Sequence, residues 1–72
     1  MKYAIVFERT PSGYSAYVPD LPGCVAAAGS HGRVEKLIHE AVALHLEALR
    51  GDGVPIPEAS TSVGSVEVPG PR

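Results

Sequence analysis

The chain has 72 residues, with six Lys and Arg against eight Asp and Glu and a formal net charge of −2. This length allows one domain, and the basic residues are too scattered to form the basic stripe by which small domains bind nucleic acid directly. No apolar run approaches the roughly 20 residues of a membrane span. A single cysteine excludes an internal disulfide, and together with the lack of an export signal it predicts a cytoplasmic protein.

Three strands are predicted in the first part of the chain. Residues 2–8 alternate in side-chain direction and are rich in β-branched and aromatic types, which favours a strand. Proline and glycine within 9–13 predict a short turn, and therefore a hairpin to a second strand at 14–18. After a break at 19–23, the apolar residues 24–28 predict a short third strand.

One amphipathic helix is predicted after the third strand. Ser30 suits the N-cap, and from there to Arg50 apolar residues recur at the i, i+3, i+4, i+7 spacing of one helix face. Gly51 is expected to follow the helix with a positive φ. The apolar stripe widens through Val42 and Leu46 beyond what one small sheet face needs, which indicates a second contact surface.

A fourth strand is predicted on a sheet edge at 63–68, where apolar and polar side chains alternate again. Residues 69–72 are expected to be a frayed tail. The predicted fold class is therefore α+β, with a small antiparallel sheet covered by one amphipathic helix in the order β-β-β-α-β. We expect a single domain over residues 1–68 and no separate DNA-binding domain.

The first predicted strand has apolar side chains on both of its faces. One helix can cover only one face of a sheet, so the other face must be exposed or covered by another subunit. This surplus of apolar surface predicts a homo-oligomer. The residues expected at a partner interface are Tyr17, Val42, His45, Leu46 and Leu49.

Several residues raise catalytic or metal-binding alternatives. Cys24 would need an electropositive setting to act as a nucleophile, and the sequence favours a buried thiol instead. His39 and His45 are six positions apart, roughly 120° around a helix, which does not fit the H-E-x-x-H spacing of a zinc site. The acids near the predicted strands are Glu8, Asp20 and Glu67. These are too few for a Mg²⁺-dependent nuclease, so we expect no metal, no cofactor and no enzymatic activity.

The most distinctive loop consists of Asp20, Leu21, Pro22, Gly23 and Cys24. In one interpretation it is a structural crossover, in which the Asp20 side chain hydrogen-bonds its own backbone. In the other it is a recognition loop for a partner. Both interpretations stay open at this point, and one residue can serve both.

The motif at 3–8 leads into a second motif at 13–24, and the helical motifs at 38–41 and 44–47 are followed by the proline-spaced segment 53–57. In this order the motifs resemble the HicB-like antitoxin family. The resemblance implies a partial ribonuclease H-like fold, β-β-β-α-β, without the acidic catalytic set of true ribonucleases. It also implies a partner, a small HicA-type mRNA-cleaving toxin that the antitoxin blocks, and assembly into dimers or tetramers.

Two functions follow as hypotheses. In the first, the protein is a non-catalytic antitoxin that neutralises a small basic HicA-type toxin by direct binding, and the acidic balance of the chain suits such a partner. In the second, it is a stand-alone, self-assembling structural or regulatory protein without a toxin. Many HicB antitoxins carry a C-terminal helix-turn-helix or ribbon-helix-helix module for operator DNA. We find no such module here, and neither hypothesis includes direct binding to nucleic acid or a membrane.

Overall fold

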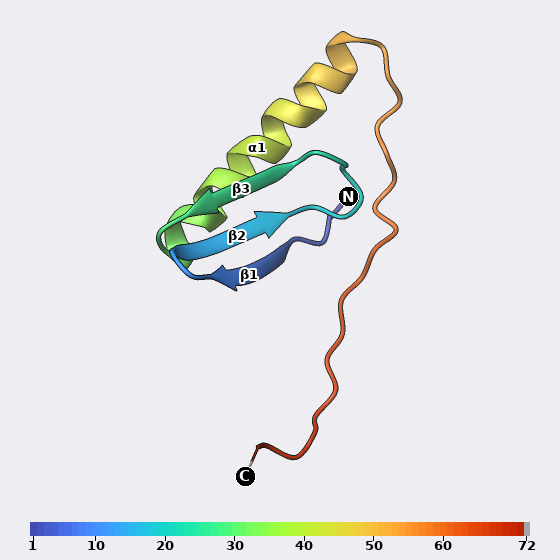
Figure 1. Ribbon diagram of the computed structural model, residues 1–72. Coiled ribbons are helices and arrows are strands. Elements are labelled where there is room, and N and C mark those ends of the chain that lie inside the picture. Colours follow the sequence, from blue (N-terminus) through green and yellow to red (C-terminus); the bar gives the residue numbers. More distant parts are fainter. Residues whose placement is uncertain (72) are drawn as a thin grey trace.

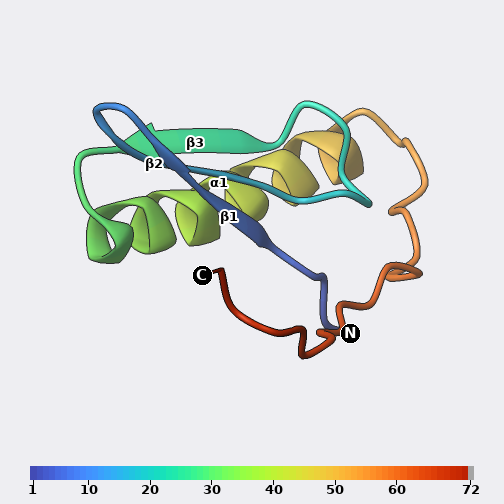
Figure 2. The same cartoon turned by 60° about the horizontal axis from the view of Figure 1, so that its bottom comes forward.

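The protein folds as a three-stranded sheet covered by one helix (Figure 1). The computed structural model describes residues 1–71. Its elements are β1 (Val6–Thr10), β2 (Gly13–Tyr17), β3 (Val25–Ala28) and α1 (His31–Gly51). The strands form one antiparallel sheet in the order β1-β2-β3, and α1 lies along one face of it (Figures 1 and 2). The predicted α+β class, with an antiparallel sheet under a single helix, is confirmed.

β1 begins later in the chain than the alternation predicts, at Val6 rather than at residue 2. Its first residue pairs with Tyr17, the last residue of β2. Beyond Tyr17 the chain turns into a tight loop, so no strand of the described chain lies opposite residues 1–5. The alternation of apolar and polar residues indicates which side chains share a face. A strand also requires backbone hydrogen bonds to a neighbouring strand.

A two-residue turn joins β1 to β2, and Gly13 is the first residue after it. A Cβ at Gly13 would lie 2.2 Å from the Ala28 carbonyl oxygen and 2.7 Å from the Gly29 Cα. Both of these atoms belong to the backbone, so neither can swing aside as a side chain would. Glycine is therefore required where the end of β3 approaches the hairpin.

α1 begins after Ser30, as the sequence predicts. The hydroxyl oxygen of Ser30 accepts a hydrogen bond from the Arg33 backbone N–H at 3.2 Å, which satisfies one of the donors left free in the first turn of a helix. The imidazole of His31 packs against Phe7 and against the edge of Tyr14, with ring centroids 4.6 and 5.4 Å apart. These contacts join the start of the helix to the hairpin.

The end of α1 differs from the prediction. Gly51 is still helical, and the glycine with a positive φ, 71°, is Gly53. The Gly53 N–H donates to the Arg50 carbonyl oxygen at 3.2 Å, and the Val54 N–H donates to the Leu49 carbonyl oxygen at 2.9 Å. These two bonds form a Schellman motif with Gly53 at its left-handed position. Either Gly51 or Gly53 could occupy this position as far as the local sequence is concerned. The helix continues through Gly51, so Gly53 occupies it.

The core lies between α1 and the helix-facing side of the sheet, and half of it comes from the chain that joins β2 to β3. Six described residues are fully buried, namely Ala16, Val18, Leu21, Cys24, Val34 and Ile38. Leu37 and Leu44 are apolar residues of α1 that are exposed, so the sheet covers only part of the helix's apolar surface. No helix within residues 1–71 has the length and apolarity needed to cross a membrane.

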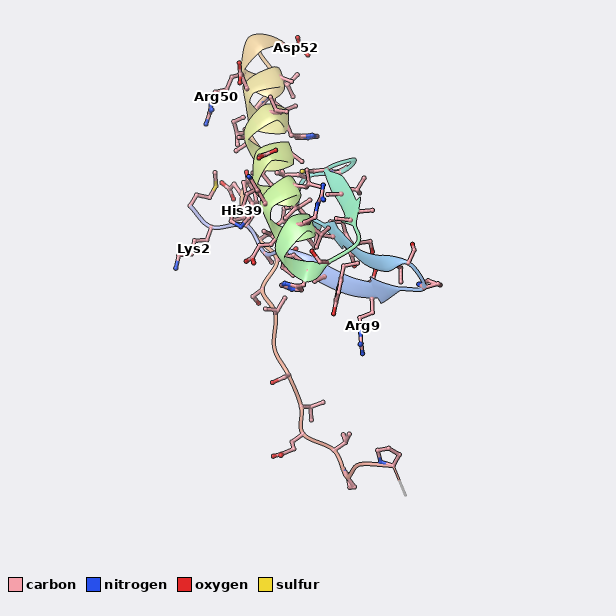
Figure 3. All side chains as sticks on the ribbon, turned by 90° about the vertical axis from the view of Figure 1, so that its left-hand side faces the viewer. Lys2, Arg9, His39, Arg50 and Asp52 are labelled. Atoms are coloured by element: carbon pink, nitrogen blue, oxygen red, sulfur yellow. The ribbon has the colours of Figure 1, made fainter. Side chains whose placement is uncertain are left out.

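Residues 54–71 form neither helix nor strand, so the fourth strand predicted at 63–68 is not formed. The segment returns from the end of α1 to the end of the sheet and then extends away from the domain on the side of β1 (Figures 1 and 3). A strand needs a neighbour with which it exchanges backbone hydrogen bonds, and the sheet of the described chain contains only β1, β2 and β3. The tail predicted at 69–72 includes Arg72, which lies outside the described residues.

Candidate protein-binding surfaces

The loop between β2 and β3, which holds the predicted recognition residues, is built around two buried side chains. Its backbone closes on itself, because the Cys24 N–H donates to the Leu21 carbonyl oxygen at 3.0 Å and the Val18 N–H donates to the Cys24 carbonyl oxygen at 3.2 Å. Leu21 and Cys24 point into the core, whereas Pro22 and Gly23 are exposed. A partner can therefore reach the tip of the loop but not its two apolar side chains.

Asp20 anchors a distant segment of the chain. Its carboxylate accepts hydrogen bonds from the backbone N–H groups of Ser60 at 3.0 Å and Thr61 at 2.9 Å. It also accepts from their hydroxyl groups, at 3.1 Å from Ser60 and 2.8 Å from Thr61. These bonds, foremost the one from the Thr61 N–H, stabilise the charged form and hold the pKa of Asp20 below its ordinary value. One of the two interpretations of the loop had Asp20 bonding its own backbone, whereas the donors that the structure shows lie 40 and 41 residues away.

Residues 57–61 form a strap across the end of the sheet. One attachment is Asp20, and the other is the Tyr3 hydroxyl, which donates to the Pro57 carbonyl oxygen. Tyr3 precedes β1 and Asp20 follows β2, so the strap joins the two segments that extend beyond the paired strands. After the strap come residues 62–71, the arm, for which no hydrogen bond to the rest of the described chain is found.

A groove of about 410 Å³ runs between the segment before β1 and the helix. Its lining residues are Met1, Tyr3, Ile5, His39, Val42, Leu46 and Arg50. The N-terminal segment supplies one wall and α1 the other, since the four helical positions recur on one helix face. Lys2, His39 and Arg50 point to the same side of the molecule (Figure 3). The groove is therefore lined mainly by apolar side chains, with the cationic Arg50 among them.

The face of the sheet turned away from α1 carries an apolar row. Val6, Tyr17 and Val25 are paired directly across the three strands, so their side chains share one face. Ala16 precedes Tyr17 in β2 and is buried against the helix, which means that the row points the other way. Tyr17 is 39% exposed and Val25 is 64% exposed. Glu8 lies on the same face, two residues along β1 from Val6.

The five predicted interface residues do not form one surface. Tyr17 belongs to the open face of the sheet, whereas Val42 and Leu46 line the groove on the helix side. His45 and Leu49 are half-buried on α1 and are not among the residues that line the groove. The structure thus offers two separate surfaces, the open face and the groove.

Two side chains considered for chemistry in the sequence, Cys24 and Asp20, are engaged in the structure. Cys24 is buried, and this burial raises the pKa of its thiol, which disfavours the nucleophilic thiolate. The carboxylate of Asp20 already accepts hydrogen bonds from two residues. Within residues 1–71, no three His, Cys, Asp or Glu side chains are grouped so that they could hold a metal.

Sequence reasoning missed two contributions to these surfaces. Ser60 and Thr61 bind Asp20, although the sequence shows them only as small polar residues after a proline-spaced segment. Met1 and Arg50 line the same groove although they lie far apart in the chain. Neither pairing has a local signal, because both arise when α1 packs on the sheet and the chain returns to the sheet's end.

The family model described as the HicB-like antitoxin of bacterial toxin–antitoxin systems matches residues 3–69. Among solved structures, a chain of the HicA3 and HicB3 toxin–antitoxin complex is similar at 35% identity with a TM-score of 0.71, over 83% of this chain and 70% of that chain. The crystal structure of antitoxin HicB3 is similar at 35% identity with a TM-score of 0.68, over 83% of this chain and 44% of that chain.

Two curated proteins are also similar. An uncharacterized 14.9 kDa protein from the rep-hol intergenic region of Haemophilus phage HP1 is 32% identical over 60 residues, which are 83% of this chain and 45% of that protein. A UPF0150 protein of Helicobacter pylori strain J99 is 40% identical over 47 residues, 65% of each chain. The chain therefore spans less than two thirds of either relative. Because the family match covers almost its whole length, the chain belongs to the HicB-like antitoxin family of bacterial toxin–antitoxin systems.

Proposed function

We propose that the protein is a non-catalytic antitoxin that neutralises a small HicA-type, mRNA-cleaving toxin by direct complex formation. The observation that carries this proposal is the match to a chain of the HicA3 and HicB3 complex, which covers 83% of this chain at a TM-score of 0.71. The domain thus shares its fold and a third of its aligned residues with a component of a toxin–antitoxin complex. We further propose that it acts in the cytoplasm without contacting nucleic acid or a membrane directly.

The open face of the sheet is the surface that we assign to the toxin. Its apolar row places an exposed tyrosine, Tyr17, between Val6 and Val25. Tyrosines in such positions often contribute most to protein–protein binding energy, because they bury a large area with little loss of conformational freedom. Glu8 on the same face supplies a negative charge suited to a basic partner. The exposed tip of the loop, Pro22 and Gly23, is the part of the recognition loop available for contact.

The test is co-expression with a HicA-type toxin encoded next to the protein's gene. We expect relief of the toxin's growth arrest and co-purification of a complex. Tyr17→Ala should weaken the complex by about tenfold or more, as measured by isothermal titration calorimetry. Leu44→Ala is the matched control, since it truncates an exposed apolar side chain on α1, away from the open face.

Two results would separate the parts of this proposal. Absence of both growth rescue and complex would refute the antitoxin function. Normal rescue with an unchanged Tyr17→Ala affinity would refute only the assignment of the open face.

The alternative is a self-assembling structural or regulatory protein without a toxin. The observation that favours it is the exposure of apolar side chains on two separate surfaces, the open face and the groove, in a chain with only six fully buried residues among those described. Self-association without any binding to a HicA-type toxin would favour this alternative.

A further inference from the structure

The arm is the most unusual part of the described chain. Its three valines, Val63, Val66 and Val68, are 74%, 83% and 68% exposed, and the arm extends away from the domain (Figures 1 and 3). The radius of gyration is 14.5 Å, whereas a compact chain of this length is expected to have about 11 Å. An extended segment with exposed valines and free backbone groups is suited to pairing with the edge of a sheet.

A free sheet edge lies beside the groove. β1 is an outer strand, with β2 as its one neighbour in the sheet of the described chain. The segment before β1 continues this edge, and its residues Tyr3 and Ile5 line the groove together with Val42 of α1. A strand placed along this edge would therefore direct every second side chain into the groove.

The arm matches this edge in pattern and in charge. Val66 and Val68 share one face of an extended chain, while Val63 and Glu67 lie on the other. With the two valines in the groove, Glu67 would lie on the side of the edge that carries Lys2. Glu67 is the only charged side chain in 62–71, and Lys2 is the only one in residues 1–5. Their opposite signs favour this pairing.

The attachment of the arm indicates whose edge it binds. Asp20 holds Thr61, so the arm starts at the end of the sheet and points outward past β1 rather than along it. Ten residues can span at most roughly 33 Å, enough to reach a second domain placed beside the β1 edge. When two copies face each other across a two-fold axis, each can give an arm and receive one, and the exchange closes.

We propose that residues 63–68 of one copy form a strand along the β1 edge of a second copy, with Val66 and Val68 in its groove, and that the exchange is reciprocal. The occupant of the groove is thus the arm of another molecule of the same protein. This surface is separate from the open face assigned to the toxin, so the two partners do not compete for it.

The experiment measures self-association of the full chain without toxin. Sedimentation velocity is recorded at protein concentrations from about 1 to about 100 μM, because the dimer fraction depends on concentration. We expect a dimer for the wild type and at least about a hundredfold weaker association for the double substitution of Val66→Asp and Val68→Asp. Val63→Asp is the matched control, because it places the same charge on the opposite side of the arm, and it should leave association nearly unchanged. Circular dichroism should show the same fold for all three proteins, since the arm is exposed.

A crosslink distinguishes exchange from folding back within one chain. The substitutions Val68→Cys and Val42→Cys are combined, and isotopically labelled and unlabelled chains are mixed before oxidation. Mass spectrometry should find disulfides that join a labelled chain to an unlabelled one. A wild-type chain that sediments as a monomer, a disulfide formed within single chains, or equal effects of Val63→Asp and the double substitution would each overturn the proposal. None of these outcomes bears on toxin neutralisation, which is measured separately.

Discussion

Leu21→Ala tests whether the loop between β2 and β3 is a structural part of the core. Leu21 is 0% exposed, and the substitution removes three buried carbon atoms. At about 0.8 kcal/mol for each, the transfer term is about 2.4 kcal/mol, and the cavity left behind raises the loss to about 3–4 kcal/mol. A chain of 72 residues has a free energy of unfolding of about 4–11 kcal/mol at typical values per residue. The variant should therefore lose at least about a quarter of its stability.

The assay is urea unfolding followed by far-ultraviolet circular dichroism, with every variant at one protein concentration so that any self-association affects all of them equally. Leu44→Ala is the matched control, because it removes the same atoms from a side chain that is 66% exposed on α1. Its free energy of unfolding should stay within about 0.5 kcal/mol of the wild type. Equal losses in the two variants, or a loss below about 1 kcal/mol for Leu21→Ala, would refute the assignment of the loop to the core.

Three further predictions concern single residues. Because the folded pKa of Asp20 is lowered, its contribution to stability is present above the ordinary carboxyl pKa and is lost as the pH falls through the folded pKa. Asp20→Asn should remove this part of the pH dependence of the free energy of unfolding, measured with urea between pH 7 and 2. The same pH dependence in both proteins would contradict the role of Asp20 as the attachment of residues 60 and 61. Gly13→Ala should lower the free energy of unfolding by about 1–3 kcal/mol, since its Cβ would meet the Ala28 carbonyl oxygen. Gly32→Ala has open space around it in α1 and should raise the free energy of unfolding by up to about 1 kcal/mol. Thermal unfolding of the two variants compares these effects. Cys24, whose thiol pKa is raised by burial, should react with Ellman's reagent slowly in the native protein and rapidly in urea, and fast native reaction would show that the thiol is accessible.

The sequence by itself determined the elements whose signals are local. The alternation in the first part of the chain and the helical spacing after Ser30 identify three strands and one helix, and the structure contains all four. The N-cap at Ser30 could be predicted because it involves one side chain and a backbone N–H three residues later. The motif order also identified the family, which the match over residues 3–69 confirms.

The tertiary structure decided every feature that needs a partner far along the chain. Residues 63–68 alternate as a strand does, yet they remain unpaired, because alternation provides no neighbour for the backbone. Asp20 was recognisable as a distinctive residue, but its donors lie 40 and 41 positions away and carry no signal at Asp20 itself. Tyr17 and Val42 were both recognisable as surplus apolar residues, and only the packing of α1 on one face of the sheet placed them on different surfaces. Periodicity identifies an apolar face on each element, whereas the pairing of those faces depends on the whole fold.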